Sequence, residues 1–297
     1  MTMIFQNVSK RNKVLAGCLI GIILLYILAL SYAFLNWHFN KVDVAEERAK
    51  IEEAIAAKTD FTINLTKNTS LKMIRVEPGS FIMGKDNSED DLLSMHNPEP
   101  HRVTLTKPFY ICETEVTEKQ WCAVMKSFSL FSLRSGNTPV ASAEWYNAME
   151  FCNELNSNGF APEGWKFTLP TEAQWEFAAR GGNKSRGYKF SGSNNIDEVA
   201  WYGGNCTNLH PVKEKKANEL GLYDMSGNVA EWCLDSLRSY TCDPVTDPVG
   251  EMEGVGARAY RGGSYSDSAE SCYSFSRSSN GGFLAVGGFR LVLVPVN

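Results

Sequence analysis

The chain of 297 residues is long enough for one large domain or two small ones, and its 43% hydrophobic and 21% charged residues are typical of a folded protein with a sizeable core. The net charge of −5 and a pI near 5.5 leave no basic excess. Nucleic acid is therefore not an expected partner.

Residues 14–35 form a run without a charged side chain. As a helix with a rise of about 1.5 Å per residue, this run spans about 33 Å, which matches a bilayer core of about 30 Å. Lys10, Arg11 and Lys13 precede it, whereas acidic residues dominate the segment that follows. The positive-inside rule predicts a single-pass membrane protein, with residues 1–13 in the cytoplasm and the C-terminal domain periplasmic or extracellular.

A cleaved signal peptide is the alternative for this segment. Ser31, Tyr32 and Ala33 resemble a small-residue cleavage site. The apolar run, however, exceeds the roughly 7–15 residues of such signals. Its length therefore favours a retained anchor.

The cysteines divide between the predicted membrane span and the outer domain. Cys18 lies in the span and is predicted to act there as a small apolar residue. Seven others would face an oxidising compartment, and their odd number predicts at least one free thiol or a bond between chains. They have no CxxC or Cys/His ligand spacing, which argues against a structural zinc site. These seven are Cys112, Cys122, Cys152, Cys206, Cys233, Cys242 and Cys272.

Residues 36–69 are predicted to be a stalk and linker. Residues 40–58 are rich in Ala, Glu and Lys, with Ile51 and Ile55 spaced as on one face of a helix. They predict a solvated spacer helix, and a short coiled coil is the alternative. Residues 59–70 are polar and are expected to be linker.

Three helices are expected in the remainder, among short β-rich segments and glycine-rich loops. Thr117 has Gln120 in the capping-box position, and Thr171 is followed in the same way by a short helix through Ala179. A helix between them is expected to begin at Ser142 or, as the weaker alternative, at Glu144.

Five sequence blocks carry a resemblance to a known family. They are MIRVEPGSFIMG (73–84), LPTEAQWEFAARGG (169–182), GLYDMSGNVAEW (221–232), RGGSY (261–265) and GFRL (288–291). In this order they resemble the sulfatase-modifying-factor family, which includes the formylglycine-generating enzymes. The resemblance covers residues 70–297, predicted to be one domain. It implies an α+β, C-type-lectin-like formylglycine-generating-enzyme fold with little regular secondary structure.

The resemblance also implies a calcium site. In the family, the positions matching Asp224, Gly227, Val229 and Glu231 bind Ca²⁺ through two side chains and two backbone carbonyls. Carboxylate and carbonyl oxygens are the ligands that Ca²⁺ prefers. An Asp cap and a surface Glu are the alternative reading of the two carboxylates.

The oxidase chemistry of the family is incompletely represented. Formylglycine-generating enzymes hold Cu(I) between two thiolates, and here Cys272 matches the second position while Asp267 occupies the first. A carboxylate is a hard ligand that does not replace a thiolate for Cu(I). Ala230 also stands where most relatives carry Trp, although Ser264 matches an active-site serine.

Other catalytic constellations are not evident in the sequence. The four histidines form no ligand pair, and neither a Gly-x-Ser-x-Gly elbow nor a Walker-type loop occurs. Glu172 and Glu176 are predicted to serve as a helix-start charge and a structural hydrogen-bond acceptor rather than as catalytic carboxylates. Arg180 and Arg290 are predicted to be structural ion-pair partners.

Residues 265–283 have the Ser, Tyr, Asn, Gly and Phe content of binding loops. They also resemble the variable segment of retroelement-diversified proteins, which lies between similar flanking motifs. A solvent-exposed loop without a partner is the alternative. The predicted ligand-binding residues are Tyr265, Asp267, Tyr273, Phe275, Arg277 and Phe283.

Together these observations predict a calcium-supported, outward-facing binding or display module for a protein or glycan, anchored in the membrane. The alternative is a copper-dependent formylglycine-generating oxidase that converts a sulfatase cysteine. In that case Cys272 and Ser264 would be the catalytic residues.

Overall fold

The structure is a computed structural model that describes residues 23, 24, 26, 41–85, 100–126, 136–237, 239–240, 242–250, 257–279 and 287–296. The described residues from Val42 onward form one compact unit. The predicted membrane span, residues 14–35, lies almost entirely outside the described residues. Among the helices that the structure describes, none combines the length and apolar character needed to cross a bilayer.

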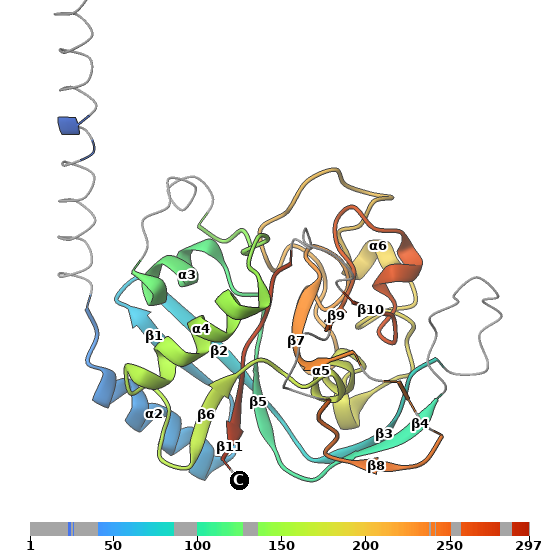
Figure 1. Cartoon of the computed structure of the whole chain (residues 1–297), viewed down its shortest axis with the longest axis horizontal. Coiled ribbons are helices and arrows are strands. Elements are labelled where there is room, and N and C mark those ends of the chain that lie inside the picture. The colour runs from blue at the N-terminus through green and yellow to red at the C-terminus, as the bar shows by residue number, and fades with distance from the viewer. Residues whose placement is uncertain are drawn as a thin grey trace, which may run out of the picture. The chain divides into compact units, whose positions relative to one another are not determined.

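The compact unit mixes short helices with three small sheets (Figure 1). Its helices are α2 (Val44–Ala57), α3 (Glu118–Met125), α4 (Trp145–Ser157), α5 (Glu172–Ala179) and α6 (Ile196–Val199), with 3₁₀ turns η1 (Gly182–Lys184) and η2 (Ala269–Cys272). Its strands are β1 (Phe61–Thr66), β2 (Thr69–Val76), β3 (Gly79–Met83), β4 (His101–Leu105), β5 (Phe109–Cys112), β6 (Trp165–Thr168), β7 (Glu231–Ser236), β8 (Val245–Thr246), β9 (Arg258–Arg261), β10 (Arg277–Ser279) and β11 (Val292–Pro295). The predicted α+β class is confirmed.

A five-stranded sheet of order β1-β2-β5-β11-β6 separates two hydrophobic cores. All its pairings are antiparallel. Successive side chains of a strand point to opposite faces, so Tyr110 and Cys112 of β5 enter one core while Phe109 and Ile111 enter the other. β5 therefore reads as a continuous apolar run, because both of its faces are buried.

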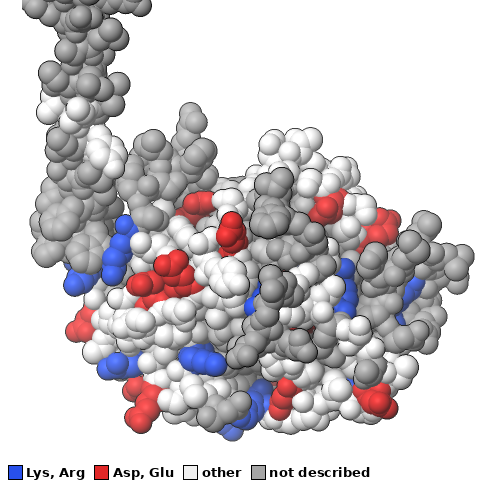
Figure 2. Space-filling model, viewed as in Figure 1, with Lys and Arg blue, Asp and Glu red and all other residues white. Residues whose placement is uncertain are grey.

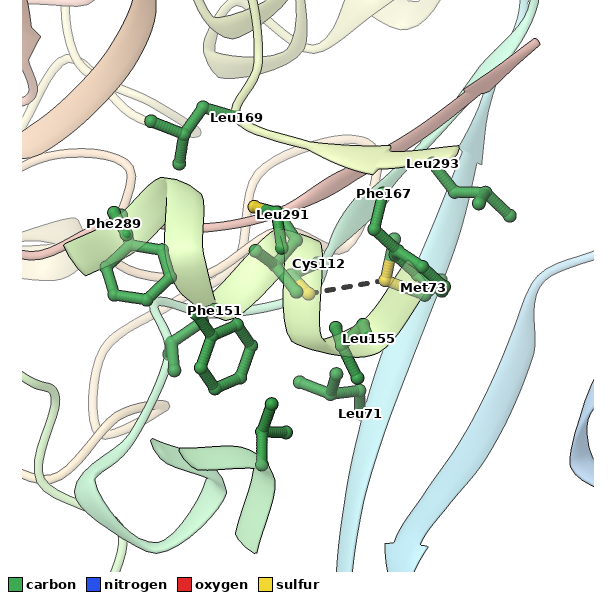
Figure 3. Packing of buried hydrophobic residues seen from close by; sticks show 14 of the residues in the cluster. Leu71, Met73, Cys112, Phe151, Leu155, Phe167, Leu169, Phe289, Leu291 and Leu293 are labelled. Carbon is green, nitrogen blue, oxygen red and sulfur yellow. Dashed lines mark hydrogen bonds between the residues drawn. The ribbon is translucent and has the colours of Figure 1, made fainter. Parts of the chain in front are cut away.

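The first core lies under α2, α3 and α4 (Figure 1). Phe151 and Leu155 of α4 pack there against apolar side chains from the sheet, as Figure 3 shows. In the same core the Cys112 thiol contacts the Met73 sulfur at 3.2 Å. This packing holds the helices on one face of the sheet.

The second core joins the large sheet to α5 and to the sheets β10-β9-β7 and β3-β4-β8. Trp175 and Phe177 of α5 are fully buried in it. Because α5 packs against β7 and β9, it is fixed beside the sequence blocks 221–232 and 261–265. This core therefore carries the candidate site.

The predicted stalk and linker over residues 36–69 is wrong for most of its length. A helix does form, but Ile51 is 0% exposed and packs in the first core, so α2 is not a solvated spacer. Both carboxylate oxygens of Glu47 accept from Asn64 of β1, from its backbone N–H at 2.7 Å and its side-chain amide at 3.1 Å. The compact unit therefore begins near Val42 rather than at residue 70.

The predicted capping boxes at Thr117 and Thr171 are confirmed, with the hydroxyl of each accepting from the backbone N–H three residues later. The middle helix begins after Glu144, which was the weaker alternative, rather than after Ser142. Asn147 explains the difference, because its side chain accepts from the Glu144 backbone N–H and closes the capping box there.

Candidate functional site

In the block 221–232 the chain reverses direction in a tight turn, and several of its residues adopt the left-handed backbone conformation. Asp224, Gly227 and Asn228 have φ values of 56°, 77° and 60°. A Cβ on Gly227 would lie 2.2 Å from the Trp201 carbonyl oxygen, so only glycine fits. The reversal places the Asp224 side chain in the interior and leads directly into β7.

Glu231, the first residue of β7, is held by a cation. Arg290 donates to both of its carboxylate oxygens, from Nε at 2.7 Å and Nη2 at 2.6 Å. The indole N–H of Trp175 donates to the same carboxylate at 2.7 Å. The predicted structural roles of Arg290 and Arg180 as ion-pair partners are confirmed, since Arg180 pairs with Glu176 at 2.8 Å.

Two further carboxylates lie near this pair, and both are buried. Burial, followed by the negative charges of Asp224 and Glu231, raises the pKa of Glu115 well above its ordinary value. Burial likewise raises the pKa of Asp224 to about 6. Of these three carboxylates only Glu231 pairs with the Arg290 guanidinium, so an ionised Asp224 leaves the cluster with an excess of negative charge.

Glu115 was not among the predicted site residues. Its carboxylate accepts from the backbone N–H of Val229 at 3.1 Å and the side-chain amide of Asn228 at 3.0 Å. It thereby fixes the reversal from a segment more than 100 residues earlier in the chain. No spacing in the sequence indicates this contact, because the segment reaches the turn only through the tertiary fold.

The predicted calcium ligands fit an ion only in part. The negative excess and the Asp224 carboxylate suit a cation, but the oxygens of Glu231 already accept from Arg290 and Trp175. Within the described ranges, no three acidic, His or Cys side chains come together closely enough to hold a metal. A Ca²⁺ here would depend on Asp224 and the carbonyls of Gly227 and Val229, without the Glu231 side chain.

Ser264, Asp267 and Cys272 lie close to one another in one turn. The Asp267 carboxylate accepts from both the backbone N–H of Ser264, at 2.8 Å, and its hydroxyl, at 2.7 Å. Cys272 is 0% exposed, and burial, followed by the charge of Asp267, raises the pKa of its thiol to about 12. A Cβ on Gly263 would lie 2.9 Å from the Cys272 sulfur, so the turn packs directly on the thiol.

A second thiol, Cys206, borders the same segment and was not predicted. Its sulfur lies 3.7 Å from the Tyr265 carbonyl oxygen, and Gly203 of the same loop donates its N–H to the Asp267 carbonyl at 2.9 Å. Its position could not be inferred from the sequence, because nearly 60 residues of mostly irregular chain separate it from residue 265. The seven described cysteines are all free thiols.

This arrangement does not fit Cu(I). The ion prefers soft thiolate ligands, and Cys272 supplies one sulfur to this group. The other family position is occupied by Asp267, a hard ligand already engaged with Ser264.

The predicted ligand-binding residues fall into different environments. Tyr265, Asp267 and Tyr273 are partly exposed. Phe275 is only 4% exposed and stacks on Tyr273, so it supports the loop rather than contacting a ligand. Phe283 lies outside the described residues.

Arg277 is also structural. Its Nε donates to Glu172 Oε1 at 2.7 Å, and the Arg261 Nε donates to the same oxygen at 3.0 Å. Arg261 extends the network to Glu176 at 2.7 Å. The predicted structural roles of Glu172 and Glu176 are confirmed, whereas the predicted ligand contact of Arg277 conflicts with its burial in this network.

Comparison with known proteins decides the family. The model of the sulfatase-modifying factor enzyme 1-like domain matches residues 60–294. The chain belongs to this family. The predicted family resemblance is thereby confirmed, and the match begins inside the segment that the sequence suggested was linker.

Relatives in the family carry different names. The chaperone protein LppX of Paenibacillus barcinonensis is 34% identical, over 61% of this chain and 78% of LppX. The formylglycine-generating enzyme of Streptomyces coelicolor is 33% identical, over 48% of each chain. The chain thus spans about half the length of that enzyme. The solved structure of Treponema denticola variable protein 1 has a TM-score of 0.68 at 31% identity, covering 80% of this chain and 99% of the other.

Proposed function

We propose that the chain is an outward-facing, membrane-anchored binding or display module for a protein or a glycan. The observation that carries this proposal is the segment 264–272, whose outer side chains are exposed while its base is rigidly held. Ser266, Ser268 and Glu270 are exposed, and Tyr265 and Asp267 are partly so. These five residues are called the display surface below.

The support beneath the display surface consists of the partly exposed Tyr273 and the buried groups that it and Cys272 contact. The Tyr273 ring stacks on Phe275 with centroids 5.1 Å apart and contacts the tilted ring of Phe190 at 5.0 Å. The carbonyl of Cys272 accepts from the Ser226 hydroxyl at 2.8 Å. Because these contacts fix the base, ligand binding would require little ordering of the loop.

The site fits the formylglycine-generating enzymes only in part, because Asp267 stands at the first of their two thiolate positions. The oxidase alternative, with Cys272 and Ser264 as catalytic residues and a sulfatase as partner, lacks an accessible thiolate pair. This difference favours the display reading, on a fold that we propose to be C-type-lectin-like.

The location follows from the N-terminal run. We propose that residues 14–35 anchor the chain and that the domain lies outside the cytoplasm. Added protease should then reach the domain once any outer barrier is permeabilised, while an N-terminal tag stays protected. On the face seen in Figure 2, acidic and basic side chains are interspersed, which gives no support to nucleic acid as a partner.

The test compares two variants of the full chain on an array of purified surface proteins and polysaccharides. Ser266→Arg with Ser268→Arg changes the display surface, and Thr62→Arg with Asn153→Arg adds the same charge at exposed positions elsewhere. We expect array signals that the first variant loses and the second keeps. If the first variant keeps all array signals, or if both variants lose the same signals, the display surface is not the binding site.

A further inference from the structure

A polar groove lies between the β1–β2 hairpin, the first turn of α3 and the loop around Lys213. Its volume is about 360 Å³, within the roughly 300–1,000 Å³ range of small-molecule sites. Its described lining residues all lie outside the segment 264–279, so the groove is separate from the display surface. They are Asn68, Thr69, Ser70, Leu71, Lys72, Cys112, Glu113, Thr114, Thr117, Lys119, Gln120, Asn137, Val212 and Lys213.

The charged groups of this lining leave the groove positive. Lys72, Lys119 and Lys213 line it together with one carboxylate, Glu113. The ammonium of Lys72 lies 2.8 Å from Glu113 Oε1, and that of Lys213 lies 2.7 Å from Oε2. One carboxylate cannot neutralise three ammonium groups, so the lining favours an anionic ligand.

Glu113 also determines where two of these charges sit. It is 8% exposed, and although burial opposes its ionisation, Lys213 and Lys72 hold its pKa below the ordinary value. Both lysine side chains remain more than 40% exposed, so their remaining ammonium hydrogens can reach a ligand. The buried carboxylate thus positions two cations in advance of binding.

The uncharged lining indicates what else the ligand carries. It is composed mainly of amide and hydroxyl side chains, which donate and accept hydrogen bonds in several directions. This composition suits a ligand with many hydroxyl groups and one anionic group.

We propose that this groove binds an acidic sugar, a hexuronic acid or a sulfated hexose. The anionic group pairs with Lys72, Lys119 and Lys213, and the ring hydroxyls contact the amide and hydroxyl side chains around them. The site does not depend on the display surface or on its ligand. It gives the chain a second, carbohydrate-directed binding site.

The first experiment measures binding of four probes to the detergent-solubilised full chain by titration calorimetry. The probes are glucuronic acid, glucose 6-sulfate, glucose and inorganic sulfate. We expect one or both acidic sugars to bind at least about tenfold more tightly than glucose or sulfate alone, with an affinity that falls as salt rises. The tighter of the two acidic sugars identifies the anionic group.

Three outcomes overturn the proposal. If glucose binds as tightly as the acidic sugars, the lysines do not contribute to recognition. If neither acidic sugar binds, the groove is not a site for acidic sugars. Inorganic sulfate binding as tightly as glucose 6-sulfate would show an anion site without sugar recognition, which also contradicts the proposal.

The second experiment uses variants that separate binding from folding. Lys119→Gln, at an exposed position, should weaken binding by at least about threefold, whereas Lys184→Gln removes an exposed lysine elsewhere and should leave it unchanged. Unchanged affinity in Lys119→Gln, or an equal loss of affinity in Lys184→Gln, would refute the proposed contacts.

Discussion

Arg290 joins the two most distinctive sequence blocks of the chain through Glu231, with both residues almost completely buried. Besides its two bonds to the carboxylate, Arg290 donates to the carbonyls of Cys112 at 3.1 Å and Tyr223 at 2.9 Å. The ion pair therefore fastens the segment before β11 to β5, β7 and the reversal at residues 222–230. It is the central polar contact of the candidate site.

Removing one partner of this pair should destabilise the protein strongly. Arg290→Met leaves the Glu231 carboxylate buried without its cation, which costs about 3–5 kcal/mol. Arg102→Met, at an exposed position, is the control and should change stability by less than about 0.5 kcal/mol. Denaturant unfolding of both variants checks this, and a wild-type midpoint for Arg290→Met would contradict it.

Calcium is the second prediction. The negative excess around Asp224 predicts that Ca²⁺ raises the melting temperature, because an ion at 100 times its Kd adds about 2.7 kcal/mol to the folded state. Asp224→Ala should abolish the response to a chelator, while Asp243→Ala, at an exposed position, should retain it. Identical melting curves with and without chelator would show that the resemblance does not extend to this site.

The third prediction concerns the N-terminal boundary of the domain. Ile51 is fully buried in the first core, so Ile51→Ala should cost about 2–5 kcal/mol. Glu52→Ala, on the exposed face of the same helix, should cost less than about 0.5 kcal/mol. If the two variants unfold at the same denaturant concentration, α2 is not part of the folded core.

The parts of the fold that depend on neighbouring residues could be predicted from the sequence better than those that depend on long-range contacts. The capping boxes at Thr117 and Thr171 were predictable because their partners lie three residues away. Strand β1 also carries a readable signal, since Phe61, Ile63 and Leu65 alternate with polar residues, yet its polar composition suggested linker. Composition was the weaker guide there, because a strand with one buried face needs apolar residues at only every second position.

The site was less accessible to prediction for a different reason. Glu115 and Cys206 reach the blocks 221–232 and 261–265 through irregular loops, to which neither helical nor strand periodicity applies. Arg277 was misassigned because its surrounding composition is typical of a binding loop. Its buried partner Glu172 is 105 residues away in sequence.

The fourth prediction is a dependence of stability on pH. Burial opposes ionisation of Glu176, but Arg180 and Arg261 outweigh it and hold its pKa below the ordinary value of a glutamate. The unfolded state then binds the proton more readily, so stability is present above about pH 4.5 and falls as pH decreases through the lower folded pKa. Glu176→Gln should flatten this acid limb of a plot of unfolding free energy against pH, and Glu163→Gln, at an exposed position, should not. An unchanged slope in Glu176→Gln would assign the acid sensitivity to other groups.

The last prediction is that the chain does not generate formylglycine at the rate of its active relatives. Cys272 is buried with a pKa of about 12, and Asp267 holds Ser264 instead of offering a second thiolate. The purified full chain, given Cu(I), oxygen and a peptide with the sulfatase Cys-x-Pro-x-Arg motif, should therefore leave the peptide cysteine intact by mass spectrometry. Asp267→Cys with Ala230→Trp restores the family residues and should yield the aldehyde, which an added Cys272→Ala should abolish. Aldehyde from the unmodified chain that disappears in Cys272→Ala would establish the oxidase, because no other described cysteine matches the family's thiolate positions.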